Sequence, residues 1–156
     1  MPAARRTARQ LPMRRPSGGI WWHDGVRFAC QGSGRCCVSR GAYGWVYLTL
    51  ADRRRLAKAL GLPTRRFTRE YCDKTDGLFH LKESGPDCMF LAERRCSVYD
   101  SRPTQCRTWP FWPENMSAKA WTGIAAGCPG VGKGRVVPVE EIRRLLREQR
   151  ASTAQL

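Results

Sequence analysis

Apolar residues in this chain fall into short groups between glycine, proline and arginine, and their spacing predicts small secondary-structure elements. Residues 1–18 mix Pro, Arg, Ser and Gly without a hydrophobic period, which predicts a disordered basic tail. Packing is expected to begin at Ile20, in a short extended stretch that passes through Val26 and Phe28. Residues 43–48 are aromatic and β-branched, and they predict a strand.

Two helices are predicted next. The first starts at Thr49, because Asp52 lies three residues on and the two side chains can cap a helix reciprocally. Its apolar stripe would consist of Leu56, Ala59 and Leu60. The second starts at Thr64 and is expected to end within residues 73–77. Residues 78–81 then predict a short strand.

The C-terminal region predicts one more helix. Pro138 suits a first helical turn, and the apolar positions after it are Val139, Ile142, Leu145 and Leu146. Residues 130–134 lack the spacing of a phosphate-binding loop and are interpreted as a linker. The expected fold class is therefore α+β, a small irregular single domain with short strands, two central helices and a C-terminal helix. Its expected parts are the tail 1–18, a cysteine-rich domain over 19–137, and an amphipathic helix with a tail over 138–156.

Eight cysteines point to a metal, because three lie between residues 30 and 37 and four more between residues 88 and 128. Thiolates are strong ligands for zinc and for the iron of iron–sulfur clusters. The alternatives are free thiols, or disulfides, which need an oxidising compartment. The N-terminal residues contain no apolar segment of the length that an export signal needs. A reducing, cytoplasmic setting with a metal is therefore the preferred interpretation.

The cysteine spacing argues against a simple zinc ribbon, because the chain has no C-x2-C pair. Gaps of five, seven, nine and 21 residues would bring the ligands from different loops. Cys36 and Cys37 are adjacent, and in an extended backbone they would point to opposite faces, into two sites or into one site and the core. Seven or eight sulfurs would fill two tetrahedral sites, or one cluster with spare thiols. The spacing leaves both arrangements open.

The pattern C-x5-C-C, then C-x7-C-x-V-Y-x-x-R-P-x-x-C-R-x-W-P, then C-P-G resembles the YkgJ-like cysteine-cluster proteins, over about residues 26–131. The resemblance implies a CxxCxxCC domain that chelates zinc or iron. It also implies that the cluster cysteines are Cys30, Cys36, Cys37, Cys88, Cys96, Cys106 and Cys128. Ser33 stands where the signature has its second cysteine, and Cys72 is a candidate replacement. The alternative for Cys72 is a buried free thiol.

Other polar residues near the cysteines have two interpretations each. Arg102 and Arg107 flank Cys106, where they would favour the thiolate form, or they would pair with acidic residues such as Asp100 and Glu114. His23 or His80 would complete a site of three cysteines and one histidine, or serve as an ordinary surface or core residue. Residues 109–113, rich in tryptophan and proline, are expected to pack a small core, the alternative being a surface for a peptide or a base.

The formal net charge of +15 raises the question of a nucleic-acid partner. Residues 1–15 contribute five arginines and no acidic residue, so part of that charge belongs to the tail. A basic protein without specific nucleic-acid binding is the preferred interpretation, and nucleic acid is only weakly supported as a partner. The chain has no run of 18 apolar residues, so no membrane association is expected.

Familiar catalytic and nucleotide-binding motifs are missing from the sequence, so no catalytic residue is predicted and an enzyme is not the preferred class. Three hypotheses remain. The first is a protein in which zinc or iron organises the fold and a surface for a protein partner. The second is an iron–sulfur redox enzyme component, or an accessory to protein modification. The third is a basic, metal-stapled nucleic-acid binder.

Overall fold

The computed structural model describes residues 19–37, 44–83 and 85–156. The predicted tail, residues 1–18, and Tyr43 in the predicted strand lie outside the described residues. The helices of the described part are α2 (Leu50–Ala59), α3 (Thr64–Tyr71), α4 (Thr104–Thr108), α5 (Ala118–Gly127) and α6 (Val139–Thr153). Three short 3₁₀ turns accompany them: η1 (Arg35–Cys37), η2 (Tyr99–Ser101) and η3 (Pro113–Asn115). None of these helices is long and apolar enough to cross a membrane.

Short strands pair two by two in the described part of the chain. They are β1 (Val26–Phe28), β2 (Cys72–Thr75), β3 (Leu78–Leu81), β4 (Leu91–Ala92), β5 (Arg95–Cys96) and β6 (Val131–Val137). The antiparallel pairs are β1 with β6, β2 with β3, and β4 with β5. Together with the helices they form one small α+β domain, which confirms the predicted fold class.

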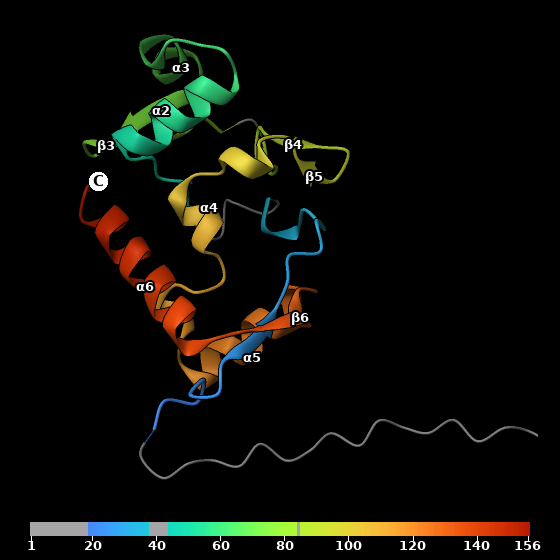
Figure 1. Cartoon of the computed structure of the whole chain (residues 1–156). Coiled ribbons are helices and arrows are strands. Elements are labelled where there is room, and N and C mark those ends of the chain that lie inside the picture. Colours follow the sequence, from blue (N-terminus) through green and yellow to red (C-terminus); the bar gives the residue numbers. More distant parts are fainter. Residues whose placement is uncertain (1–18, 38–43, 84) are drawn as a thin grey trace, which may run out of the picture.

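Two hydrophobic cores hold these elements together. The first lies beneath α2 and α3 and includes Leu56 and Phe67, which have no exposed surface. The second lies between the β1–β6 pair, α5 and α6, and includes Phe111 and Ile142. Figure 1 shows α4 between the two cores, with α6 running along one side. The α4–α6 contact joins the two ends of the domain, and a hydrogen bond of 2.8 Å from the Thr108 hydroxyl to Gln149 is part of it.

Helix α2 begins as predicted. The Thr49 hydroxyl accepts from the Asp52 N–H at 3.1 Å, and the Asp52 carboxylate accepts from the Thr49 N–H at 3.1 Å, which confirms the capping box. The predicted apolar stripe is partly wrong. Leu56 is buried and Leu60 is half-buried, but Ala59 is exposed, and the buried alanine is Ala57.

Helix α3 ends earlier than predicted. It stops at Tyr71, and the residues expected to finish it form strand β2, which pairs with β3. The predicted strand over residues 43–48 is reduced to a single bridge between Tyr47 and His80. The strand over residues 78–81 is confirmed as β3.

The interpretation of residues 130–134 as a linker is wrong. Residues 131–134 belong to β6, which pairs with β1 in the register Val26 to Val137. Helix α6 follows as predicted, and Ile142 and Leu146 bury its apolar face in the second core. Within residues 109–113, Phe111 is 2% exposed and stacks on Trp121 at 5.7 Å, which confirms that this run packs the core.

Candidate metal centre

The paired cysteines lie in the 3₁₀ turn η1. The Cys37 N–H donates to the Gly34 carbonyl at 2.8 Å and closes this turn. Cys37 is buried and Cys36 is exposed, yet their thiols meet in a hydrogen bond. The expectation that the two side chains point to opposite faces is therefore wrong, because the backbone here is helical and not extended.

Three other cysteines gather near Cys37. Hydrogen bonds from the neighbouring thiols of Cys36 and Cys96 raise the pKa of Cys37 far above its usual range, and burial adds to the effect. The charges of Cys36 and Cys88 raise this pKa further. Thus Cys88 lies near this group as well, and its backbone N–H donates to the Cys37 carbonyl at 2.7 Å.

The β4–β5 hairpin positions Cys88 and Cys96. Cys96 pairs with Leu91 across the hairpin, and the Leu91 N–H donates to the Cys88 carbonyl at 2.8 Å. Gly34 packs on the same hairpin: a Cβ atom at this position would collide with the carbonyl oxygen of Arg94. The loop that carries Cys36 and Cys37 is therefore in backbone contact with the hairpin that carries Cys96.

Cys30 and Cys128 lie on a second pair of adjoining loops. The Ala29 N–H donates to the Gly130 carbonyl at 3.1 Å, next to both cysteines in the chain. Cys30 is exposed, and Cys128 is half-buried at the C-terminal end of α5.

Tyr99 contacts Cys30, and the sequence analysis did not select it. A hydrogen bond with the Cys30 thiol raises the pKa of Tyr99, and partial burial raises it further. The guanidinium of Arg102 lies 3.7 Å from the centre of the Tyr99 ring, and its Nε donates to the Tyr99 carbonyl at 2.7 Å. The V-Y pair after Cys96 in the sequence pattern was the available signal for this tyrosine.

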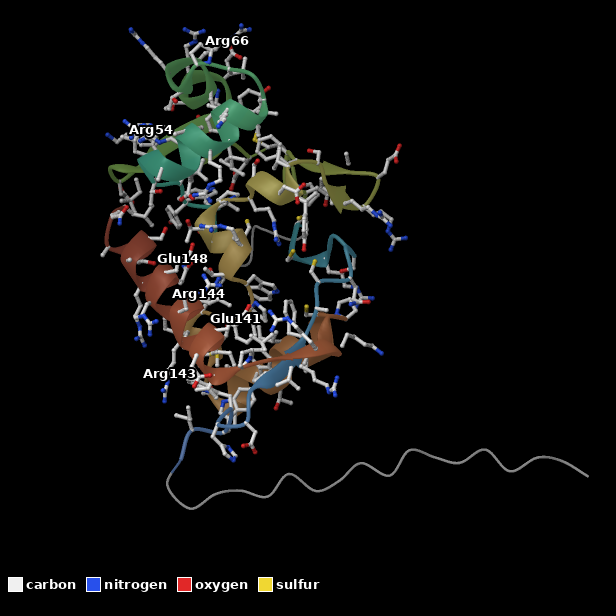
Figure 2. The ribbon with its side chains drawn as sticks, viewed as in Figure 1. Arg54, Arg66, Glu141, Arg143, Arg144 and Glu148 are labelled. Carbon is white, nitrogen blue, oxygen red and sulfur yellow. The ribbon has the colours of Figure 1, made fainter. Side chains whose placement is uncertain are left out.

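Cys106 lies on α4, half-buried against the first core. Arg107 reaches α6, where its Nη2 pairs with Glu148 at 2.6 Å. Glu148 also pairs with Arg144 one turn earlier on α6, at 3.3 Å (Figure 2). Arg107 thus joins two helices, and its acidic partner is Glu148.

Cys72 is buried in the first core, in strand β2. Burial raises the pKa of its thiol to about 11, although the charges of Arg53 and Lys82 act in the opposite direction. A thiol with this pKa is mostly protonated near neutral pH and is therefore a weak nucleophile.

Neither histidine has a ring nitrogen directed to a cysteine in the described contacts. His80 is buried and stacks on Trp45 at 4.2 Å. Its Nε2 lies 3.0 Å from the Thr75 hydroxyl, and its Nδ1 lies 2.9 Å from the Leu81 carbonyl. His23 is exposed and pairs with Asp24 at 3.0 Å.

The donor set around Cys37 suits a thiophilic metal. Zinc takes four thiolates, and a cation would favour the thiolate form of groups that otherwise raise one another's pKa. Within the described ranges, no three His, Cys, Asp or Glu side chains stand in the close spacing of a finished metal site. In the described part of the chain, the thiols of Cys36, Cys37, Cys88 and Cys96 thus lie near one another, but not at the spacing of metal ligands.

Residues 29–129 match the model of a protein family described as "CxxCxxCC: Putative zinc- or iron-chelating domain". The chain belongs to this family. The match begins just before Cys30 and ends just after Cys128, so it contains both cysteine-bearing loop pairs and the whole first core. Zinc or iron binding is therefore the function that the family assigns to this domain. No solved structure matches the chain at a significant level.

Proposed function

We propose that this protein binds zinc or iron through Cys36, Cys37, Cys88 and Cys96, and that the metal fixes the loops that carry them. The observation that carries the proposal is the meeting of the Cys37 thiol with Cys36 and Cys96, beside Cys88. The four residues come from three segments of the chain: η1, the loop before β4, and β5. A metal held by them would cross-link these segments, as structural zinc does in other small domains.

The remaining family cysteines, Cys30, Cys106 and Cys128, are proposed as ligands of a second site. Cys30 and Cys128 lie on loops joined by the bond from Ala29 to Gly130, which supports their grouping. This assignment predicts two metal ions per chain. A measured content of one metal ion per chain would leave only the site formed by the cysteines around Cys37. We place the protein in the cytoplasm, where thiols stay reduced.

The test is metal content per chain, measured by elemental analysis on protein purified without oxygen and without an affinity metal. Cys37→Ser should lose at least one metal equivalent, because it removes the sulfur at the middle of the group. Cys72→Ser is the matched control, a buried cysteine outside the group, and should keep the wild-type content. A wild-type metal load in the Cys37→Ser protein would overturn the proposal.

Metal removal gives a second readout. If the metal cross-links the three segments, a chelator should lower the free energy of unfolding and expose the first core. Urea unfolding followed by circular dichroism measures this directly. An identical midpoint with and without metal would contradict the organising role while leaving binding itself intact.

A further inference from the structure

An open basin with a volume of about 550 Å³ lies beside the cysteine loops. Its walls come from three segments of the chain, within residues 31–35, 93–95 and 129–133. Figure 1 shows the segment that leads into η1 between the β4–β5 hairpin and the end of the molecule formed by α5 and β6. Each of the three segments that form the basin lies next to a cysteine in the chain, although no cysteine lines the basin itself.

The basin is strongly positive. Its charged lining residues are Arg35, Arg94, Arg95, Lys133 and Glu93, four cations with one carboxylate. All five are exposed, and among the described residues none of them forms an ion pair. Other arginines of this protein find partners, as Arg107 and Arg135 do with Glu148 and Glu141.

The β4–β5 turn carries Arg94, and Arg95 follows it at the start of β5. Glu93 and Arg94 have φ angles of 47° and 66°, in the left-handed region, and neither is a glycine. Positive φ angles at both loop residues are typical of the tight two-residue turn that joins paired antiparallel strands. Gly34 packs directly against the Arg94 carbonyl of this turn. The hairpin thus places both Arg94 and Arg95 at the basin.

We propose that this basin binds a small multivalent oxyanion of the phosphate or polycarboxylate type. Arginine guanidinium groups present paired N–H donors that match phosphate and carboxylate oxygens. Arg94 and Arg95 on the β4–β5 hairpin, with Arg35 in η1 and Lys133 on β6, would contact such a ligand from several sides. The volume is in the range of small-molecule sites, about 300–1,000 Å³.

A different role for these cations would be to offset the negative charge of metal-bound thiolates. That role predicts a loss of metal when the arginines are removed, whereas the oxyanion site predicts an unchanged metal content. The inference does not rest on the metal, because the basin is formed by side chains other than the proposed ligands.

The experiment is isothermal titration calorimetry at fixed ionic strength, with pyrophosphate in one arm and citrate in the other. The variant is R94N/R95Q, in which Asn at position 94 tolerates the positive φ angle. The matched control is R54Q/R143Q, which removes the same charge from exposed positions on α2 and α6, away from the β4–β5 turn in Figure 2. Metal content is measured on all three proteins.

We expect one ligand per chain in at least one arm, and the stronger arm identifies phosphate or carboxylate as the recognised group. R94N/R95Q should weaken this binding at least tenfold with an unchanged metal content, and R54Q/R143Q should change it less than twofold. Absence of binding tighter than about 1 mM in both arms would overturn the inference. Equal losses of anion affinity in the two variants would also overturn the inference, since they would show that the anion is attracted by the overall positive charge of the protein. A protein that carries metal but binds neither anion would contradict this inference alone.

Discussion

The buried carboxylate of Asp52 receives two hydrogen bonds from Thr104, one from its backbone N–H and one from its hydroxyl, both at 2.9 Å. The residues lie 52 positions apart, and Asp52 is 1% exposed. The other carboxylate oxygen accepts from the N–H and the hydroxyl of Thr49. One side chain therefore joins the start of α2 to the start of α4, the helix that carries Cys106.

Asp52→Ala should lower the free energy of unfolding substantially. The substitution leaves the buried N–H groups of Thr49 and Thr104 without their acceptor, at a cost of about 1–3 kcal/mol for each. Urea unfolding measures the effect. Asp73→Ala, which removes an exposed carboxylate on β2, is the control and should stay within about 0.5 kcal/mol of wild type. Equal stabilities of the two variants would contradict the role of Asp52.

Gly34→Ala should destabilise the protein more than Gly32→Ala. Both glycines have positive φ angles, 68° and 61°, so both substitutions carry a similar backbone cost of about 1–2 kcal/mol. Only at Gly34 would the new Cβ collide with the Arg94 carbonyl, because at Gly32 it meets open space. Unfolding midpoints and metal content of the two variants make the comparison. If Gly34→Ala were the milder change, the packing of this loop on the hairpin would be wrong.

Cys72 should resist alkylation in the folded protein. Burial raises the pKa of its thiol to about 11, so at pH 8 on the order of one molecule in a thousand carries the thiolate. Mass spectrometry after iodoacetamide treatment gives the rate, which should rise as the pH approaches 11. The guanidinium-unfolded chain is the control, with an ordinary pKa of about 8.5. Equal rates in the folded and unfolded chains would refute the burial of this thiol.

The same pKa difference predicts a pH dependence of stability. The folded pKa lies above the unfolded one, so the contribution of Cys72 is complete below about pH 8.5 and is lost as the pH rises toward about 11. In the Cys72→Ala variant, this part of the alkaline loss should disappear. Unfolding measured between pH 8 and pH 10.5 tests the sign, and a contribution that grew with pH would contradict it.

Arg107→Leu should lower stability and leave the metal content unchanged. Its guanidinium pairs with Glu148 and donates to the Thr104 hydroxyl at 3.1 Å, so its loss weakens the α4–α6 contact. An expected cost is about 1–2 kcal/mol, since the pair is partly exposed. Arg144→Leu, which removes the longer pair to Glu148, should cost less. A loss of metal in Arg107→Leu at wild-type stability would instead assign this arginine to the thiolates.

The sequence predicted the local features of the fold because they depend on neighbouring residues. The Thr49–Asp52 capping box and the amphipathic helix after Pro138 are of this kind. Strand β6 was missed because its partner β1 lies more than 100 residues away, and its glycines look like a linker locally. The end of α3 was misplaced for a similar reason, since the pairing of β2 with β3 competes with the helix.

The sequence pattern nominated the candidate cysteines but gave no indication of how they meet in space. The cysteine pattern named all the sulfurs, but the turn η1, which turns the Cys36 and Cys37 thiols toward each other, has no signal in the local sequence. Cys72 enters the first core, against which Cys88, Cys96 and Cys106 also pack, and its place there depends on the pairing of β2 with β3. The link from Cys30 to Tyr99 depends on how two loops far apart in the sequence pack together.

The central claim is that sulfur atoms around Cys37 hold a metal. X-ray absorption at the zinc and iron edges, on protein purified without oxygen and without an affinity metal, tests it most directly. The account predicts a zinc or iron signal with about four sulfur neighbours near 2.3 Å, which falls in the Cys37→Ser variant and persists in Cys72→Ser. A metal coordinated mainly by nitrogen or oxygen, or a wild-type protein without metal, would contradict it.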